Sequence, residues 1–155
     1  MKQLKYQSIL GPLYLVASEK GLKSLLWDRC RVPFAKKPEN ILALAVKELD
    51  EYFSYQRTIF TIPLEMEGTK FQMQVWKNLL KIPYGKTCSY KTLASMIKNE
   101  KATRAVGTAN GKNPLCIIIP CHRVISANGG IGGYSGGLEI KMKLLEFETK
   151  KDESS

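Results

Sequence analysis

Residues 103–124, TRAVGTANGKNPLCIIIPCHRV, place a predicted helix, an apolar run and a cysteine–histidine pair one after another. Thr103–Asn110 predicts a helix that is rich in small residues. Leu115–Ile119 is a continuous apolar run, which is typical of a buried strand. Pro120-Cys121-His122 then turns the chain. We therefore expect a cysteine and a histidine where a buried core ends.

Two further helices are predicted upstream of this stretch. The first carries an apolar stripe that Pro83 and Gly85 end, and the second is capped by Ser89. The second and third helices are short and closely connected, which resembles a helix-turn-helix. The small residues of the third helix suit either a nucleic-acid groove or close helix packing. The stripes are Phe71, Val75, Leu79 and Ile82 in the first helix, and Leu93, Ala94 and Ile97 in the second.

The N-terminal half alternates β-rich runs with one helix. Leu4–Ile9, Leu13–Ser18 and Leu22–Trp27 are separated by turn residues and predict a small antiparallel sheet. Thr58–Ile62 predicts another strand. A helix opens at Pro38 and Glu39. Its expected inward stripe is Ile41, Ala45, Leu49 and Phe53.

The polar segment Glu65–Thr69 is the expected domain boundary. We expect an α+β protein, with a small α/β N-terminal domain at residues 1–66, which carries no chemistry, and a mainly helical domain at 69–150. The second domain contains a glycine-rich loop before its last helix. That helix begins near Leu138, its inward stripe is Leu138, Met142 and Leu145, and Glu148 lies toward the edge of the stripe.

Basic residues are concentrated in the second half. The chain of 155 residues has a formal net charge of +10. Residues 1–68 carry 10 basic and 8 acidic side chains, a net +2, whereas residues 69–155 carry 14 and 6, a net +8. A polyanion such as nucleic acid is the natural partner of such a segment, although a basic face can also serve solubility alone.

Several classes of protein are excluded by composition. No apolar run approaches the length of a membrane span, and the N-terminus lacks the pattern of a secretory signal. We expect a soluble cytoplasmic protein, nuclear in a eukaryote, whose four cysteines are free thiols. A metal site is not expected, because His122 is the sole histidine and no C-x-x-C pair occurs.

Cys121 is the candidate nucleophile. A free cysteine has a pKa near 8.5 and is only about 3% thiolate at pH 7, so it needs a nearby base or positive field. His122 can accept the thiol proton, directly or through water. Glu148 can orient the imidazole if the last helix packs against this turn. The alternative is an inert core cysteine with a chance histidine neighbour.

Pro120-Cys121-His122-Arg123-Val124 resembles the signature of the O6-alkylguanine-DNA alkyltransferases, or methylated-DNA–protein-cysteine methyltransferases. Further motifs of this family match in order and spacing over residues 69–149, and the first half matches weakly. The strong matches are Phe71…Val75-Trp76, Ile82-Pro83-Tyr84-Gly85, Ser89-Tyr90, Arg104-Ala105-Val106-Gly107, Asn113-Pro114, Gly132–Leu138 and Leu144-Leu145-Glu146 through Glu148. The weak matches are Gly11-Pro12-Leu13 and Tyr52-Phe53.

The resemblance implies a ribonuclease-H-like N-terminal domain and a winged-helix-like DNA-binding domain. It also implies DNA repair by direct damage reversal. The partner would be double-stranded DNA containing O6-alkylguanine, which a monomer binds from the minor groove and whose damaged nucleotide it flips out. The alkyl group would pass once and irreversibly to Cys121, without a cofactor.

The resemblance also implies catalytic roles for five residues. Cys121 would attack the alkyl carbon, His122 would deprotonate it through water, and Glu148 would orient the imidazole. Tyr90 would assist base rotation and donate a proton to guanine N3. Asn113 would brace the active-site turn.

Binding roles follow in the same way. Backbone groups around Val124, Tyr134 and Ser135 would hold the flipped guanine. Arg104 would fill the vacated base stack. The other expected DNA contacts are Tyr90, Ala105, Gly107, Lys91 and Arg123. Lys91 and Ala127 depart from the family pattern, since some relatives have polar DNA-contacting residues there.

Two rival functions remain at this point. Alkyltransferase-like damage sensors keep the fold but replace the cysteine, whereas Cys121 is present here. A winged-helix DNA-binding module without chemistry would bind DNA in a salt-sensitive way. Its binding would be unaffected by Cys121→Ser.

Overall fold

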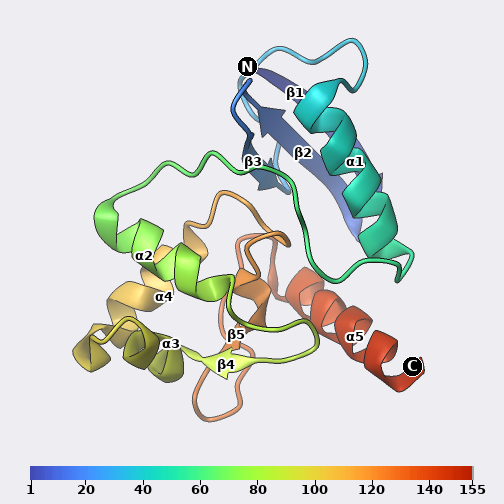
Figure 1. Ribbon diagram of the computed structural model, residues 1–155. Coiled ribbons are helices and arrows are strands. Elements are labelled where there is room, and N and C mark those ends of the chain that lie inside the picture. The colour runs from blue at the N-terminus through green and yellow to red at the C-terminus, as the bar shows by residue number, and fades with distance from the viewer. Residues whose placement is uncertain (155) are drawn as a thin grey trace. The chain divides into compact units, whose positions relative to one another are not determined.

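The computed structural model describes residues 1–154, and the side chains of residues 1–150. The chain divides into two compact units, Met1–Glu67 and the residues from Gly68 onward. The first unit combines a sheet with one helix, and the second is mainly helical (Figure 1).

The N-terminal unit is a three-stranded antiparallel sheet with a helix along it (Figure 1). β1 (Lys2–Ser8), β2 (Gly11–Ala17) and β3 (Leu22–Leu26) are paired in that order, which confirms the predicted sheet. α1 (Asn40–Phe53) packs against it. The fully buried apolar side chains are Leu13, Leu15, Leu22, Leu25, Ala45, Leu49 and Tyr52.

The strand predicted at Thr58–Ile62 is wrong. These residues are irregular in the structure. The backbone N–H of Thr61 donates to the buried carboxylate of Glu48 at 2.7 Å, and the Thr61 hydroxyl contacts the same carboxylate. This segment is therefore held by a side chain of α1 and not by a neighbouring strand.

The predicted inward stripe of α1 is partly wrong. Ala45 and Leu49 are buried as expected, but Leu42 and Tyr52 are buried in place of Ile41 and Phe53. Successive i, i+4 steps drift around a helix by about 40° each, because one turn takes about 3.6 residues. A stripe that stays on the core must mix steps of three and four.

The C-terminal unit is built on four α-helices (Figure 1). They are α2 (Lys70–Leu79), α3 (Tyr90–Met96), α4 (Thr103–Gly111) and α5 (Leu138–Ser154), with a 3-10 turn η1 (Glu100–Ala102) before α4. Ser89 caps α3 as predicted, because its side chain accepts the Thr92 N–H at 2.9 Å. Trp76 Nε1 of α2 donates to Ala109 O of α4 at 2.9 Å.

A short parallel strand pair positions the candidate site. β4 (Cys88–Ser89) pairs with β5 (Val124–Ile125), and Cys88 lies opposite Val124. α3 begins with Tyr90 directly after β4, and the 3-10 turn η2 (Cys121–Arg123) comes directly before β5. The pair therefore brings Tyr90 near Cys121, although 31 positions separate them in the chain.

The predicted inward stripe of α5 is also wrong. Leu138 and Met142 are each 49% exposed. Two polar residues are buried instead, because each has partners in the core. Within residues 138–150, the buried side chains of α5 are Lys141, Leu144, Phe147 and Glu148.

Candidate active site

The apolar run before Cys121 is buried, as expected, but it is a turn and not a strand. Ile118 N–H donates to Cys116 O at 2.8 Å, and Cys121 N–H donates to Ile119 O at 2.7 Å. Ile117, between these bonds, has φ +74°. β-Branched residues rarely adopt this region, and such strain concentrates at functional sites. The N–H groups of Ile118, Ile119 and Cys121 therefore bond within the turn and not to a neighbouring strand.

Asn113 holds this turn closed. Its Oδ1 accepts the N–H of Leu115 at 2.9 Å, and its Nδ2 donates to Ile119 O at 2.7 Å. The side chain is buried. Asn113 therefore joins the beginning of the run to the end that carries Cys121, which is the position expected of a bracing residue. Asn110, from the end of α4, adds a longer contact, with Nδ2 3.4 Å from Cys121 O.

His122, Arg123 and Glu148 form a buried cluster. Oε2 of Glu148 lies 2.9 Å from Nε2 of His122. Arg123 donates from Nε to Oε1 at 2.8 Å and from Nη2 to Oε2 at 3.0 Å. None of the three side chains is more than 7% exposed. The expected packing of the last helix against the Cys121 turn is therefore present.

The electrostatics of this cluster define the state of His122. Burial opposes ionisation of Glu148, but hydrogen bonds and charges from His122 and Arg123 outweigh it and hold the pKa of the carboxyl well below its usual range. Burial lowers the pKa of His122, more than Glu148 raises it. A neutral imidazole beside a carboxylate carries its proton on the nitrogen that faces the carboxylate. Nδ1 of His122, buried and without a partner in the described part of the chain, is then the proton acceptor.

Arg123 does not fit the DNA-contacting role expected from the sequence. Its side chain is 7% exposed and fully engaged, with Nη1 donating to Ile82 O at 2.8 Å in addition to the bonds with Glu148. A guanidinium held in this way cannot reach a phosphate. It neutralises Glu148 and anchors the loop between α2 and β4.

Lys141 is a site residue that the sequence reasoning missed. Its side chain is fully buried, and Nζ donates to Val124 O at 2.6 Å and to Gly133 O at 3.0 Å. Burial lowers the pKa of Lys141 to about 8, an effect that Cys121 opposes, so the ammonium form still predominates near pH 7. The neighbouring Cys116 and burial raise the pKa of Cys121, and the charge of Lys141 opposes this rise by favouring the thiolate. A signal existed: Lys141 precedes Glu148 by seven residues, which puts both on one helix face.

Tyr90 lies beside this lysine. Lys141 Nζ is 5.9 Å from the centre of the Tyr90 ring. Burial raises the pKa of the Tyr90 phenol, against a hydrogen bond from the backbone of Gly133. Tyr90 is therefore a neutral phenol that can donate a proton. A Cβ on Gly132 would lie 2.6 Å from its hydroxyl, so a glycine is needed for the loop to approach so closely.

The predicted guanine-holding residues surround the same turn. Val124 is buried, and its carbonyl accepts from Lys141. Tyr134 and Ser135 lie in the glycine-rich loop, and Ser135 Oγ is 3.7 Å from Sγ of Cys116. Cys116 is the second residue that the sequence reasoning missed, because within an apolar run a cysteine is typical of ordinary core.

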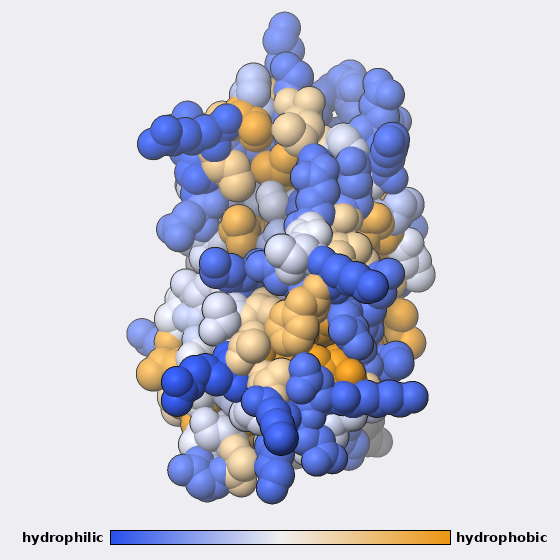
Figure 2. Space-filling model, turned by 90° about the vertical axis from the view of Figure 1, so that its left-hand side faces the viewer, coloured by the Kyte–Doolittle hydropathy of each residue, from blue (hydrophilic) through white to orange (hydrophobic). Residues whose placement is uncertain are grey.

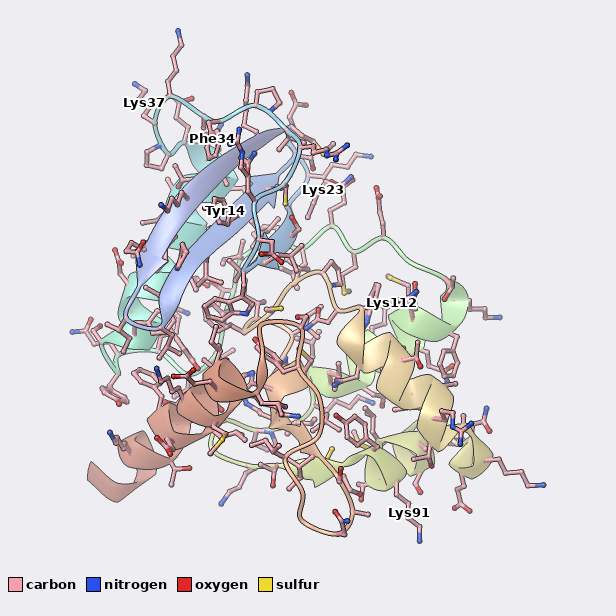
Figure 3. All side chains as sticks on the ribbon, turned by 180° about the vertical axis from the view of Figure 1, so that it is seen from behind. Tyr14, Lys23, Phe34, Lys37, Lys91 and Lys112 are labelled. Atoms are coloured by element: carbon pink, nitrogen blue, oxygen red, sulfur yellow. The ribbon has the colours of Figure 1, made fainter. Side chains whose placement is uncertain are left out.

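Of the expected DNA contacts on α3 and α4, Lys91, Arg104 and Ala105 are exposed, whereas Tyr90 and Gly107 are partly buried. Arg104 and Ala105 open α4, and Gly107 faces the Tyr90 ring, since a Cβ there would lie 3.7 Å from that ring. Lys91 points away from α3 (Figure 3). Figure 2 shows hydrophilic side chains over most of the face that it presents, with smaller apolar areas between them.

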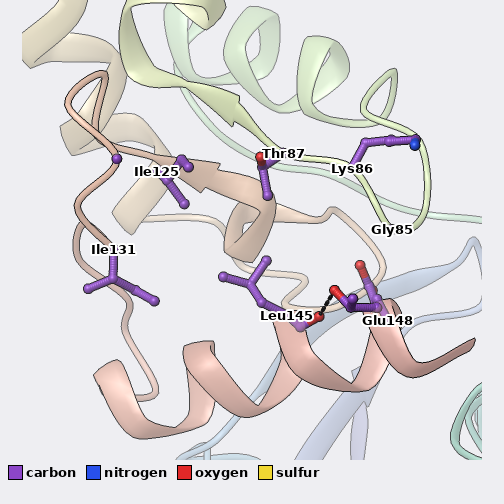
Figure 4. Close-up of a pocket in the computed structure, with 9 residues that line it drawn as sticks. Gly85, Lys86, Thr87, Ile125, Ile131, Leu145 and Glu148 are labelled. Carbon is purple, nitrogen blue, oxygen red and sulfur yellow. Dashed lines mark hydrogen bonds between the residues drawn. The ribbon is translucent and has the colours of Figure 1, made fainter. Parts of the chain in front are cut away.

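A cavity of about 210 Å³ borders Glu148 of the His122–Arg123–Glu148 cluster. In Figure 4, Leu145 and Glu148 of α5 face Thr87 and Ile125 across it. Among the described site residues only Glu148 lines this cavity, so we do not assign it to the alkyl group. Among the side chains that the structure describes, those of residues 1–150, no group of three or more His, Cys, Asp or Glu could hold a metal ion. No helix within residues 1–154 is long and apolar enough to cross a bilayer.

Comparison with known proteins identifies the family. The family model described as 6-O-methylguanine DNA methyltransferase, DNA binding domain, matches residues 70–150, and its ribonuclease-like domain matches residues 1–66. The chain belongs to this family. Membership confirms the resemblance, the α+β fold class with a ribonuclease-like first part, and the enzyme class: a methylated-DNA–protein-cysteine methyltransferase of direct-reversal DNA repair.

Relatives align over nearly the whole chain. The methylated-DNA–protein-cysteine methyltransferase of Methanosarcina acetivorans is 43% identical over 92% of this chain and 95% of the relative. That of Mycobacterium leprae is 46% identical over 91% and 88%. The crystal structure of Mycobacterium tuberculosis OGT in complex with DNA superposes with a TM-score of 0.88 at 41% identity, over 97% of this chain and 94% of that one.

Proposed function

We propose that this family member removes the alkyl group from O6-alkylguanine in double-stranded DNA and keeps it on Cys121, irreversibly and once per molecule. The main support for this proposal is the set of contacts that hold His122, the residue next to Cys121 in the chain. Arg123 and Glu148 fix the imidazole of His122, whose unpartnered Nδ1 can accept a proton.

The transfer balances without a cofactor. The thiol proton of Cys121 passes to His122 Nδ1, through a water if the distance requires one. The thiolate attacks the alkyl carbon, a C–S bond forms and the C–O6 bond breaks. The electron pair of that bond stays on guanine, which takes a proton from the Tyr90 phenol at N3. The site regains its charge balance when the proton on His122 returns to Tyr90, and a stable thioether remains.

Lys141 and Asn113 act through the backbone. Lys141 fixes the carbonyls of Val124 and Gly133, on the two sides of the pocket that would hold the flipped guanine. Its charge also stabilises the thiolate. Asn113 keeps the Cys121 turn closed, so that the sulfur approaches the alkyl carbon from one direction. Backbone groups near Val124, Tyr134 and Ser135 are proposed to bind the base itself.

DNA is proposed to bind the C-terminal unit. Residues 69–155 carry a net charge of +8, and the first turns of α3 and α4 present Lys91, Arg104 and Ala105 to solvent. Exposed Arg104 is placed to fill the stack from which the nucleotide is flipped, and Gly107 leaves room beside Tyr90. The relative from Mycobacterium tuberculosis was crystallised with DNA, which supports this proposal.

The same proposal covers organisation and location. The N-terminal domain, residues 1–66, carries no chemistry, and residues 69–150 bind DNA and accept the alkyl group. The protein acts as a monomer in the cytoplasm, or in the nucleus of a eukaryote, and does not associate with membranes. Its four free thiols suit that reducing environment.

Mass spectrometry of the protein after incubation with an O6-methylguanine duplex tests the proposal. We expect one methyl group, about 14 Da, joined to sulfur as a thioether. A protease that cleaves after Lys and Arg releases residues 113–123, which contain both Cys116 and Cys121. Fragmentation of this peptide, with Cys116→Ala as the matched control, is therefore needed to assign the sulfur.

The outcomes separate the rival functions. Cys121→Ser should bind the lesion and accept no methyl group, whereas Cys116→Ala should accept one. An unmodified wild-type protein that binds the lesion selectively would instead be a damage sensor. An unmodified protein that binds all duplexes equally would be a DNA-binding module.

A further inference from the structure

The excess positive charge of the N-terminal unit lies in one loop. Residues 29–37, which we call the basic loop, contain four basic side chains and no acidic one. The rest of residues 1–68 contains six basic and eight acidic side chains, so the basic loop has a net charge of +4 and the remainder −2. The basic residues of the loop, all exposed, are Arg29, Arg31, Lys36 and Lys37. The proposed alkyl transfer and its DNA contacts on the C-terminal unit use none of them.

The basic loop is irregular, yet it is tied to the edge strand of the sheet. Gln3 of β1 is fully buried. Its Nε2 donates to Cys30 O and to Val32 O, both at 2.6 Å, and its Oε1 accepts the Cys30 N–H at 3.2 Å. The backbone N–H of Gln3 donates to Pro33 O at 2.8 Å. One buried residue therefore fixes the loop backbone beside its arginines.

Protection of the sheet edge accounts for this pairing but not for the cations. A loop that pairs with β1 prevents the strand from pairing with another chain, and the bridge between Gln3 and Phe34 is of this kind. Backbone pairing achieves this without charged side chains. Of the four cations, only Lys37 has an ion-pair partner within residues 1–150, the exposed Glu39 at 3.5 Å. The other three have no carboxylate to offset their mutual repulsion, which indicates an external anion.

We propose that the basic loop is a second DNA-binding surface, which contacts the phosphate backbone of duplex DNA without reading its sequence. This inference goes beyond the proposed function, which places the DNA contacts on the C-terminal unit. It rests on that function only for the choice of DNA as the polyanion.

The two arginines are suited to phosphate. A surface hollow of about 350 Å³ is lined by residues 29–33, so both guanidinium-bearing residues border it. A guanidinium can donate two parallel hydrogen bonds to the oxygens of one phosphate group. Cζ of Arg29 also lies 5.0 Å from the centre of the Phe34 ring. This contact restrains the arginine before binding, which reduces the entropy lost when a phosphate is bound.

The spacing of the cations favours DNA over a single small anion. The four basic residues are spread over nine successive positions, which suits a ligand with regularly repeated charges, such as the phosphates of a duplex. The C-terminal unit of the same chain is proposed to hold DNA, and the covalent link raises the concentration of phosphates around the N-terminal unit. The basic loop can therefore add to the affinity although each exposed contact is weak by itself.

The test is the salt dependence of DNA binding by the full-length protein. Fluorescence anisotropy with an unmodified duplex of about 20 base pairs gives the affinity between about 50 and about 200 mM salt. The double variant Arg29→Gln, Arg31→Gln changes only exposed side chains and should fold. Each lost phosphate contact reduces the slope of log K against log salt by about 0.9, so we expect a slope smaller by about 2 and an affinity lower by about tenfold or more.

The matched control is the double variant Lys5→Gln, Lys47→Gln. It removes the same charge from the same unit, at two exposed positions outside the basic loop. Its slope should differ from that of the wild type by less than about 0.5, because no phosphate contact is lost. Arg104→Gln, on the C-terminal unit, reports the DNA contacts of the proposed function.

Two results would overturn the inference. One is an unchanged slope in the Arg29→Gln, Arg31→Gln protein. The other is an equal loss of slope in the control double variant, since the effect would then come from net charge alone. Arg104→Gln separates the two proposals: weaker binding in this variant alone would refute only the basic loop, whereas weaker binding in the loop variant alone would support the loop and refute the contacts proposed for Arg104.

Discussion

Glutamine at position 148 tests which nitrogen of His122 accepts the proton. Glu148→Gln keeps the shape of the side chain, and its amide oxygen can still accept from Arg123 Nε, now 2.8 Å from Oε1. The amide nitrogen then faces His122 Nε2, now 2.9 Å from Oε2. In this orientation the amide donates to Nε2, so the imidazole proton moves to Nδ1, while Arg123 Nη2, now 3.0 Å from Oε2, loses its acceptor. His122 would then have no lone pair directed at the thiol.

The expected losses follow from these contacts. A swapped tautomer removes general-base assistance, which corresponds to a drop in transfer rate of about 10²- to 10⁴-fold. Removing one partner of a buried ion pair costs about 3–5 kcal/mol. Because glutamine retains one hydrogen bond to Arg123, we expect a decrease of about 2–3 kcal/mol in the free energy of unfolding. Most domains remain folded after such a loss.

Two measurements separate rate from stability. Single-turnover transfer from a labelled O6-methylguanine duplex gives the rate, and urea unfolding gives the free energy. Glu146→Gln is the matched control, since Glu146 is exposed on the same helix, and it should change neither. Transfer within about threefold of wild type in a folded Glu148→Gln protein would refute the assignment of His122 Nδ1, because a tautomer change must exceed that factor.

Three further results are expected. Gly132→Ala should slow alkyl transfer at least tenfold, because φ at this position is +75° and the new Cβ would lie 2.6 Å from the Tyr90 hydroxyl. Gly133→Ala is the control, since no atom lies within 4 Å of its new Cβ, and it should not slow transfer. Equal transfer rates of the two variants in single-turnover assays would contradict this prediction. Lys141→Met should lower the free energy of unfolding by about 2 kcal/mol, because two hydrogen bonds from a charged group are lost while the cost of burying a cation is removed. Urea unfolding measures this free energy, and a variant more stable than the wild type would contradict the prediction. The free energy of unfolding should fall as the pH drops from about 7 to about 5. Burial lowers the pKa of His122 in the folded protein, so the unfolded chain binds the extra proton first, near the ordinary histidine pKa of about 6.5. The fall should be smaller in His122→Gln, and an equal fall would contradict a lowered pKa of His122.

Local patterns in the sequence were sufficient to predict the structural role of a residue where that role depends on its neighbours in the chain. Ser89 was recognisable as a cap, and the apolar run Leu115–Ile119 was recognisable as buried. The run was not recognisable as a turn, because the side chain that holds it, Asn113, acts through two specific hydrogen bonds. Hydrophobic periodicity contains no information about such bonds.

Buried charged side chains were the other feature that sequence patterns could not predict. A pattern that assigns apolar residues to the core must place Lys141 and Arg123 in solvent, yet both are buried. Each is stable there only because its partners, the Val124 and Gly133 carbonyls and the Glu148 carboxylate, come from other segments. The motif resemblance supplied the roles of the nucleophile and its base, which periodicity alone could not.

Because the backbone at Ile117 is left-handed, we expect substitutions at this position not to raise the free energy of unfolding. A β-branched residue there carries a backbone penalty of about 1–2 kcal/mol, and its buried side chain contributes about 2–3 kcal/mol in return. Glycine would relieve the backbone but leave a hole, and any larger residue would fill the hole but keep the penalty. Directed evolution for thermal stability should therefore enrich changes elsewhere in the chain and leave Ile117 in place.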